Sequence, residues 1–209
     1  MKKLASIATL SLVTAFAGSA AADESDGGTG PRFGLRTGYM IPIGDASKDN
    51  KLGDTVGGGI PIWLDAGYRV IPSVYVGLYF DYAILFPADK ICPSGTDCSF
   101  HQIRVGVMGA YHFIPAGPID PWAGLGIGYE IVGGSVGPGD FSTKGLEFLN
   151  LQGGADYKVT PNIRVGPFLS FSLGQYSTTT SGNQSGDIKD TAMHEWFTIG
   201  VRGAYDLNL

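Results

Sequence analysis

Eight segments of this chain alternate apolar and polar residues and then end at a turn. The clearest runs from Val74 to Ile84, where every second residue beginning with Val74 is apolar or aromatic. Side chains that repeat with a period of two lie on opposite faces of a β-strand. A length of ten or more residues also suits a tilted strand that crosses a lipid bilayer. The pattern therefore predicts an all-β protein made of long amphipathic strands.

The spacing of these segments predicts how the strands are connected. We expect strands at residues 32–42, 57–70, 73–86, 100–113, 121–133, 145–159, 162–176 and 193–207. The connectors at 43–56, 87–99, 134–144 and 177–192 are long, and the three others are shorter. Outer-membrane barrels alternate long extracellular loops with short periplasmic turns and have an even number of strands. The chain is thus predicted to form an eight-stranded antiparallel up-and-down transmembrane β-barrel.

Lysine and glycine indicate which face of the strands meets lipid. A soluble barrel such as a lipocalin hides its apolar face and shows its polar face to water. Here the lysines after the N-terminus fall in the predicted loops or beside a turn, whereas the polar face carries many glycines. Glycine weakens a solvated strand, but it makes room inside a narrow barrel. We therefore predict that the polar face lines the lumen and the apolar face contacts outer-membrane lipid.

Aromatic residues of the apolar face gather near both ends of the predicted strands. Those near the periplasmic ends are Phe33, Tyr68, Tyr111, Phe113, Tyr157 and Tyr205, and those near the opposite ends are Tyr82, Phe86, Tyr129 and Phe197. Rings at both headgroup levels form the two aromatic girdles of a membrane barrel.

The N-terminus predicts export. Residues 1–22 combine two lysines, an apolar stretch from Leu4 to Phe16 and small residues before Asp23, which is the pattern of a secretory signal peptide. Residues 23–209 are then expected to form one barrel domain. Removal of the two lysines changes the net charge from −5 to −7, and an acidic exported chain argues against nucleic acid as a partner. No later stretch is apolar enough for a membrane-spanning helix.

The lumen of an eight-stranded barrel is just wide enough to be filled by side chains, and we expect charged ones to pair there. Simple hairpin geometry places Asp81 and Glu130 opposite Arg104 on neighbouring strands, which predicts a triad. The predicted charge network comprises Asp81, Arg104, Glu130, Asp65, Arg36 and Arg202. It is interpreted as a salt-bridged plug, with a solute-selecting constriction as the alternative.

Two cysteines flank a predicted extracellular loop. Cys92 and Cys98 are an even pair in an exported chain, which predicts a disulfide. A metal-binding pair is the alternative, but no histidine has suitable spacing, so neither a metal site nor a cofactor is expected.

Two prolines interrupt the alternation. Pro61 and Pro167 each remove a donor of the hydrogen-bond ladder, so we expect each at a bulge or where a strand leaves the membrane. The alternative for Pro167 is a weak seam through which an apolar molecule leaves sideways into lipid.

The three histidines do not form a recognisable catalytic motif. His101 and His194 are predicted near the extracellular rim, and no serine or acidic residue has the spacing of a nucleophilic site. We therefore expect no catalytic residues and no enzyme activity.

The segments Trp122-Ala-Gly-Leu-Gly-Ile-Gly-Tyr129 and Ile199-Gly-Val-Arg-Gly-Ala-Tyr-Asp-Leu207 resemble the small outer-membrane protein β-barrel domain family of Gram-negative bacteria. The resemblance covers the mature chain and implies outer-membrane localisation and contact with the assembly machinery, which in that family reads an aromatic residue at the end of the last strand. Here Tyr205 and Leu207 alternate suitably, but the last residue is Leu209.

These observations predict a membrane structural or surface-interaction protein with a largely filled lumen, expected to be a monomer that can meet an extracellular ligand through its loops. Residues Ser177 to Asp190, rich in Ser, Thr, Gly and Asn, are expected to be exposed and flexible. A narrow channel or transporter for a small or apolar solute is the alternative, and a lipid A-modifying enzyme is the third possibility.

Overall fold

The strands in the structure are long and amphipathic, as the alternation predicts. The computed structural model describes residues 28–48, 50–88, 90–92, 95–182 and 184–207, and the predicted signal peptide lies outside them. The barrel strands are β1 (Gly30–Ser47), β3 (Val56–Ile71), β4 (Val74–Pro87), β5 (Cys98–His112), β6 (Ile119–Val136), β7 (Gly139–Lys158), β8 (Ile163–Ser181) and β10 (Met193–Asp206). Two short strands, β2 (Asn50–Lys51) and β9 (Gln184–Asp187), and a single 3-10 turn, η1 (Leu52–Asp54), lie between them. No helix in the described ranges is long and apolar enough to cross a membrane.

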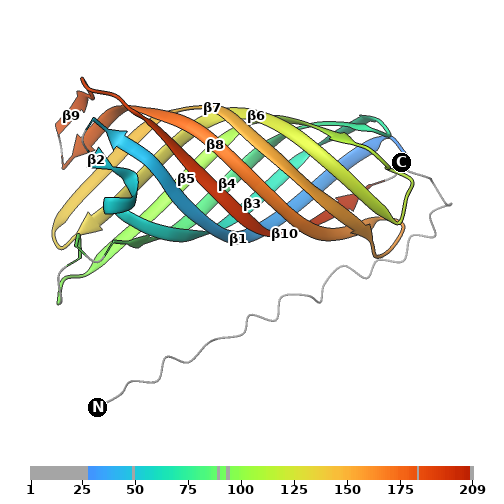
Figure 1. Cartoon of the computed structure of the whole chain (residues 1–209), viewed down its shortest axis with the longest axis horizontal. Coiled ribbons are helices and arrows are strands. Elements are labelled where there is room, and N and C mark those ends of the chain that lie inside the picture. Colours follow the sequence, from blue (N-terminus) through green and yellow to red (C-terminus); the bar gives the residue numbers. More distant parts are fainter. Residues whose placement is uncertain (1–27, 49, 89, 93–94, 183, 208–209) are drawn as a thin grey trace, which may run out of the picture.

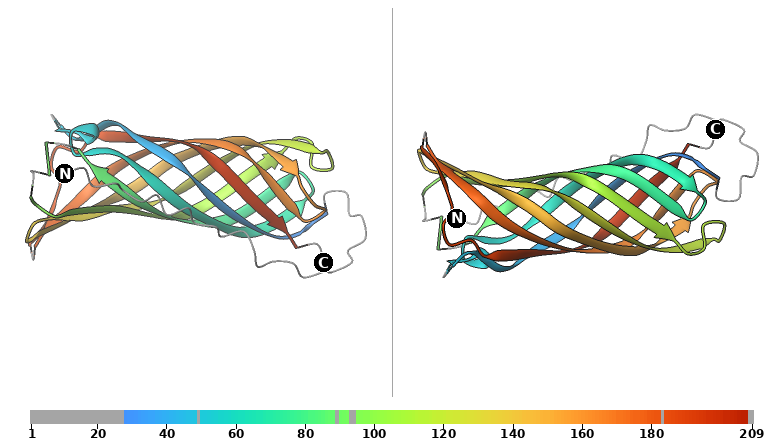
Figure 2. Two further views of the ribbon diagram at one scale, coloured as in Figure 1. Left: turned by 90° about the horizontal axis from the view of Figure 1, so that it is seen from below. Right: turned by 90° about the horizontal axis from the view of Figure 1, so that it is seen from above.

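The eight strands form a closed antiparallel barrel (Figure 1). Each strand pairs with its neighbour in the chain, and β10 closes the sheet by pairing with both β8 and β1. The strands tilt strongly around a long cylinder, which is visible from two further sides in Figure 2. The eight-stranded membrane barrel expected from the sequence is confirmed.

The two ends of the barrel differ in their connections. β1 begins and β10 ends at the same end, where Arg32 pairs with Asp206, and the connectors 72–73, 113–118 and 159–162 are short there. β2, η1 and β9 lie at the opposite end (Figure 1). Because outer-membrane barrels have short periplasmic turns and longer extracellular loops, the first end is the periplasmic one. We call the parts of the lumen toward the two ends the periplasmic and the extracellular half.

The outer wall of the barrel is apolar. Leu78 and Leu125 are 64% and 59% exposed, and they belong to a belt of Leu, Ile, Val and aromatic side chains that covers every barrel strand. Nine of the ten predicted girdle residues are exposed on this wall, and Phe197 is half-buried. So large an exposed apolar surface is stable only against hydrocarbon.

The extracellular connectors contain more strand than the sequence predicts. The expected loop 134–144 is wrong in this respect, because β6 continues to Val136 and β7 starts at Gly139, which leaves only two residues between the strands. In the same way, β8 continues to Ser181 and pairs with β9. Gly137 and Gly182 have φ of +56°, a conformation that glycine adopts without strain, so each allows a tight hairpin turn.

Pro61 and Pro167 lie in the middle of strands and not at strand ends, which corrects the expectation. No register shift occurs at either residue, but one ladder beside each is interrupted. In the β1–β3 ladder, no pair is formed between those of Ile62 and Gly59, so residues 60 and 61 lack a partner on β1. In the β7–β8 ladder, no pair is formed between those of Phe168 and Val165, so residues 166 and 167 lack a partner on β7. Each proline therefore removes pairing on one side of its strand and keeps the ladder on the other.

A bulge in β7 reverses the alternation of that strand. The register shifts between Glu147 and Leu149, so that β7 carries one extra residue against β8. Below the bulge the inward side chains have even numbers, such as Asn150 and Asp156, and above it Glu147 points inward. The bulge thereby adds a carboxylate to the lumen.

Candidate functional site in the lumen

Large side chains lie in the lumen along its whole length. The sequence places eight bulky residues inside, and all of them are buried: Met40, Trp63, Tyr75, Tyr79, Met108, Trp122, Phe168 and Trp196. Six arginines are also buried: Arg32, Arg36, Arg69, Arg104, Arg164 and Arg202. Glycines accommodate the large rings. A Cβ atom on Gly106 would lie 2.5 Å from Cζ of Tyr79, so only glycine fits beneath that ring.

Arg104 is the centre of a charge cluster in the extracellular half. Its Nε donates to Asp81 Oδ2 at 2.9 Å and its Nη2 to the same oxygen at 2.5 Å. Its Nη1 lies 3.3 Å from Glu147 Oε1 and 3.1 Å from Ser172 Oγ, on the other side of the barrel. Glu147 also accepts from Tyr79 Oη and from Asn150 Nδ2. We call Asp81, Arg104, Glu147 and Ser172 the Arg104 cluster.

Glu130 is not part of that cluster, which corrects the predicted triad. Glu130 is opposite Arg104 in the ladder, as expected, but no ion pair joins the two residues. Glu147, brought inward by the β7 bulge, is the second carboxylate of Arg104 instead.

Neutral donors surround the carboxylate of Glu130. They are Gln102 Nε2 at 2.8 Å, Tyr176 Oη at 2.5 Å and Trp196 Nε1 at 3.0 Å, while His194 Nε2 lies 3.3 Å from the second oxygen. His194 stacks on Tyr176 with ring centroids 3.9 Å apart. His194 is therefore a buried lumen residue and not a rim residue, contrary to the prediction. We call these five residues the Glu130 cluster.

An apolar cluster closes the lumen above Glu130. Leu52 of η1, Val56, Leu85 and Phe100 are buried there together with Val132. Ile91, Phe141 and Ile188 of the extracellular segments pack against them. The extracellular mouth is therefore covered by hydrophobic side chains.

Trp63 divides the two halves of the lumen. Arg36 and Arg104 both lie over its indole, with Cζ 4.7 Å and 5.3 Å from the ring centroid. Tyr79 and Phe168 pack around it at centroid distances of 5.3 Å and 6.4 Å. Cation–π contact stabilises both guanidinium groups while keeping them apart.

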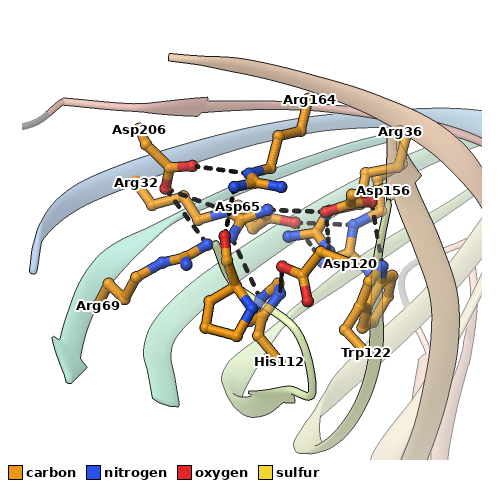
Figure 3. A network of polar contacts seen from close by, with 12 residues as sticks. Arg32, Arg36, Asp65, Arg69, His112, Asp120, Trp122, Asp156, Arg164 and Asp206 are labelled. Atoms are coloured by element: carbon orange, nitrogen blue, oxygen red, sulfur yellow. Dashed lines mark hydrogen bonds and ion pairs between the residues drawn. The ribbon is translucent and has the colours of Figure 1, made fainter. Parts of the chain in front are cut away.

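The periplasmic half of the lumen contains a second network (Figure 3). Arg36 pairs with Asp65 and donates to Gln152 Oε1 at 2.5 Å. Arg32 Nη2 donates to Asp156 Oδ2 at 2.8 Å, and Arg202, which lies over Trp122, reaches the same oxygen at 3.5 Å. The sequence predicted one charge network, but the structure contains two. Arg104 lies on the extracellular side of Trp63, whereas Arg202 and the ion pair between Arg36 and Asp65 lie on its periplasmic side.

At the periplasmic mouth, two arginines tie the turns to the barrel wall. Arg69 Nη1 donates to Pro72 O at 2.9 Å, and Arg164 Nη2 donates to Pro115 O at 2.5 Å. Both also approach Asp206, at 3.6 Å and 3.8 Å. These contacts hold the short turns over the mouth.

None of the three histidines hydrogen-bonds to a serine or threonine hydroxyl in the described residues. His112 Nδ1 contacts Asp120 Oδ2 at 2.7 Å and its Nε2 faces Arg32 Nη1 at 3.2 Å. His101 stacks on Tyr82 at the outer wall. Across the described ranges there is also no group of three His, Cys, Asp or Glu residues that could hold a metal ion.

Cys92 and Cys98 are joined by a disulfide with a Cα–Cα distance of 6.2 Å. The bond closes the loop between β4 and β5 at the extracellular end.

The chain matches no protein-family model, and it matches no curated protein. Several solved structures share its fold. Neisserial surface protein A is 15% identical and aligns over 86% of this chain and 99% of its own, with a TM-score of 0.58. The outer membrane protein AlkL in lipid bilayers is 13% identical over 92% and 97% of the two chains, with a TM-score of 0.55. A major outer membrane protein from Thermus thermophilus is 14% identical over 85% and 99%, with a TM-score of 0.53.

This protein therefore has the fold of the small eight-stranded outer-membrane barrels. Its apolar wall and closed strand order agree with an outer-membrane location. Identities this low support the fold and carry no activity from those proteins to this chain.

Proposed function

We propose that this protein is a non-conducting membrane anchor that presents a polar crown at the cell surface for interaction with an extracellular ligand. The observation that carries the proposal is the filled lumen. Six arginines and two tryptophans are fully buried inside it, and the apolar cluster above Glu130 covers the extracellular mouth. In a lumen closed in this way, the side chains stabilise the barrel and leave no path for a solute.

The crown is formed by the ends of β7 and β8 together with β9. Apart from Phe141, which packs on the apolar cluster, its residues are polar or glycine and are exposed or half-exposed. Thr143 and Thr179 contact each other across the strands at 3.2 Å. All four residues of β9 are exposed. Strand pairing makes the crown stiffer than a free loop, and a preformed surface binds a partner at a lower entropic cost.

Planar-bilayer recordings test the closed lumen. The purified protein should show no steady conductance, and the Arg104→Ala variant, which removes the centre of the Arg104 cluster, should show at most brief openings. Steady single channels from the unmodified protein would contradict the proposal.

Surface labelling tests the orientation of the crown. The chain has two cysteines, both in the disulfide, so Lys189→Cys introduces a single free thiol at an exposed site. A membrane-impermeant maleimide should label this variant on intact cells. A matched cysteine at Thr160 in a periplasmic turn should react only after the outer membrane is opened, and the reverse pattern would invert the orientation.

Transport of a small solute is the second candidate, and one observation favours it. Sixteen buried side-chain N and O atoms have no hydrogen-bond partner among the described residues, which favours water inside the lumen. A ligand-dependent conductance in the same recordings would support this candidate. A lipid-modifying enzyme is less favoured, because the described histidines contact no hydroxyl nucleophile.

A further inference from the structure

We propose that the periplasmic mouth of the lumen binds one small inorganic oxyanion, of the phosphate or sulfate class, among four arginines. The site comprises Arg32, Arg69, Arg164 and Arg202 with Asp156 and Asp206, and we call it the four-arginine site (Figure 3 labels five of these six residues). It adds a ligand to the barrel and does not depend on the proposed role of the crown.

In this site, only two carboxylates form ion pairs with four guanidinium groups. Asp156 Oδ2 accepts from Arg32 at 2.8 Å and lies 3.5 Å from Arg202. Asp206 is 3.7 Å from Arg32, 3.6 Å from Arg69 and 3.8 Å from Arg164, which are ion pairs without hydrogen bonds. The six side chains therefore carry two positive charges in excess.

Many nitrogen atoms of these arginines have no acceptor. They are Nε of Arg32, Nε and Nη2 of Arg69, Nε of Arg164, and all three nitrogens of Arg202. This statement refers to partners within the described part of the chain. The four side chains are at most 2% exposed, so these donors cannot turn to bulk water. Burying an unpaired charge costs free energy, and an anion that accepts its hydrogen bonds offsets this cost. Binding of an anion at these donors is therefore favourable.

The neighbouring carboxylates do not fill the free donors, although the negative charge of Asp120 lowers the excess in the periplasmic half to one positive charge. Asp65 pairs with Arg36. Asp120 accepts from His112 Nδ1 and from the amide of Ile114. Arginine can only donate, so His112 Nε2 accepts from Arg32, and the ring is neutral.

The geometry favours an oxyanion that arrives from the periplasm. Guanidinium groups bind the oxygens of phosphate and sulfate through paired N–H donors. Asp206 lies at the open end, with 12% of its side chain exposed, whereas Asp156 and Arg202 are fully buried. The extracellular half carries the opposite charge, with the three carboxylates of Asp81, Glu130 and Glu147 against the single arginine Arg104, so an anion is repelled from continuing through the lumen.

Calorimetric titration of the folded barrel in detergent with sodium phosphate, and separately with sodium sulfate, tests the site at constant ionic strength. We expect saturable binding at a stoichiometry near one, with a parallel rise in the unfolding temperature. Saturation separates the site from the general salting effect of these anions, which grows steadily with concentration.

Variants locate the binding. Arg202→Met, which removes the arginine without a hydrogen bond, should weaken phosphate binding at least tenfold, and Arg202→Lys should be intermediate. Lys189→Met removes one exposed charge from the extracellular connector between β9 and β10 and should bind as the unmodified protein does. If Arg202→Met does not fold, Arg164→Met gives the same comparison.

Two results would overturn the proposal. The first is the absence of saturable binding in the unmodified protein. The second is equal binding by the unmodified protein and the arginine variants.

Discussion

The two halves of the lumen handle buried charge in opposite ways. In the extracellular half, Arg104 faces Asp81 and Glu147, and Glu130 is surrounded by neutral donors, so carboxylates outnumber cations by three to one. In the periplasmic half, five arginines face four aspartates. The unpartnered buried atoms follow the same division. Among described residues they are mainly acceptors above Trp63 and mainly arginine donors below it.

This difference shows that a filled lumen need not be uniformly stable. The extracellular half consists of short ion pairs and hydrogen bonds to a few central groups, so it should act as the structural plug. The periplasmic half also contains short pairs, such as Arg36 with Asp65, but its part around Arg202 and Asp206 has contacts of 3.5–3.8 Å and free donors. That part should therefore be more tolerant of substitution and more responsive to anions.

Replacing one arginine in each half should give the largest contrast. Arg104→Met leaves Asp81 and Glu147 buried without their cation and should lower the free energy of unfolding by about 3–5 kcal/mol. Arg202→Met removes a cation that makes no hydrogen bond and should cost less than about 1 kcal/mol without phosphate. Urea unfolding in lipid vesicles measures both, and equal losses would remove the distinction between the halves.

Glu130→Leu should cost about 3 kcal/mol, because the donors of Gln102, Tyr176 and Trp196 lose their common acceptor inside the extracellular half. Glu130→Gln keeps one acceptor oxygen and is the matched control, with a smaller loss. If both variants unfold at the same urea concentration, the hydrogen bonds of the Glu130 cluster do not stabilise the barrel.

The boundary between the halves can be tested through glycine. Gly106→Ala places a Cβ against Tyr79 and the carbonyl oxygen of Ile127, and it should destabilise the barrel by about 2 kcal/mol through overpacking. Gly109→Ala is the control on the same strand, since its Cβ would meet only Tyr75 O at 3.7 Å. Thermal unfolding of the two variants should differ, and a comparable melting temperature would mean that the packing around Tyr79 is loose.

Removing the disulfide should have the smallest effect on either half. The double variant Cys92→Ser/Cys98→Ser opens a loop of only a few residues, which limits the loss to at most about 2 kcal/mol. Phosphate binding at the four-arginine site should be unchanged. A larger loss, or altered phosphate binding, would show that the loop supports the lumen at a distance.

The alternation of residues was sufficient to predict the fold. Period-two patterning places Val74 to Ile84 in β4, and inward glycines and outward leucines distinguish a membrane barrel from a soluble one. The extracellular ends were underestimated, because residues such as Thr178 and Phe141 above the membrane no longer need to alternate. Their strand structure comes from ladder pairing, of Phe141 with Ser181 and of Thr178 with Lys144.

The charge clusters were predicted less completely, for reasons that particular residues make clear. Arg104 and Asp81 follow from register alone, since hairpin geometry puts them opposite each other. Glu147 could not be found, because counting back from Asp156 assigns it to the lipid face and only the bulge turns it inward. Arg32 could have been found by extending the inward series of Gly34 and Arg36 by one step.

Each of the three tryptophans reports on a different depth of the molecule. Trp196 donates to Glu130, Trp63 lies between Arg36 and Arg104, and Trp122 lies under Arg202. In variants that keep one tryptophan at a time, the fluorescence emission of that indole would report the hydration of its own level of the lumen. Comparing the three variants would show which level is hydrated first as the barrel unfolds.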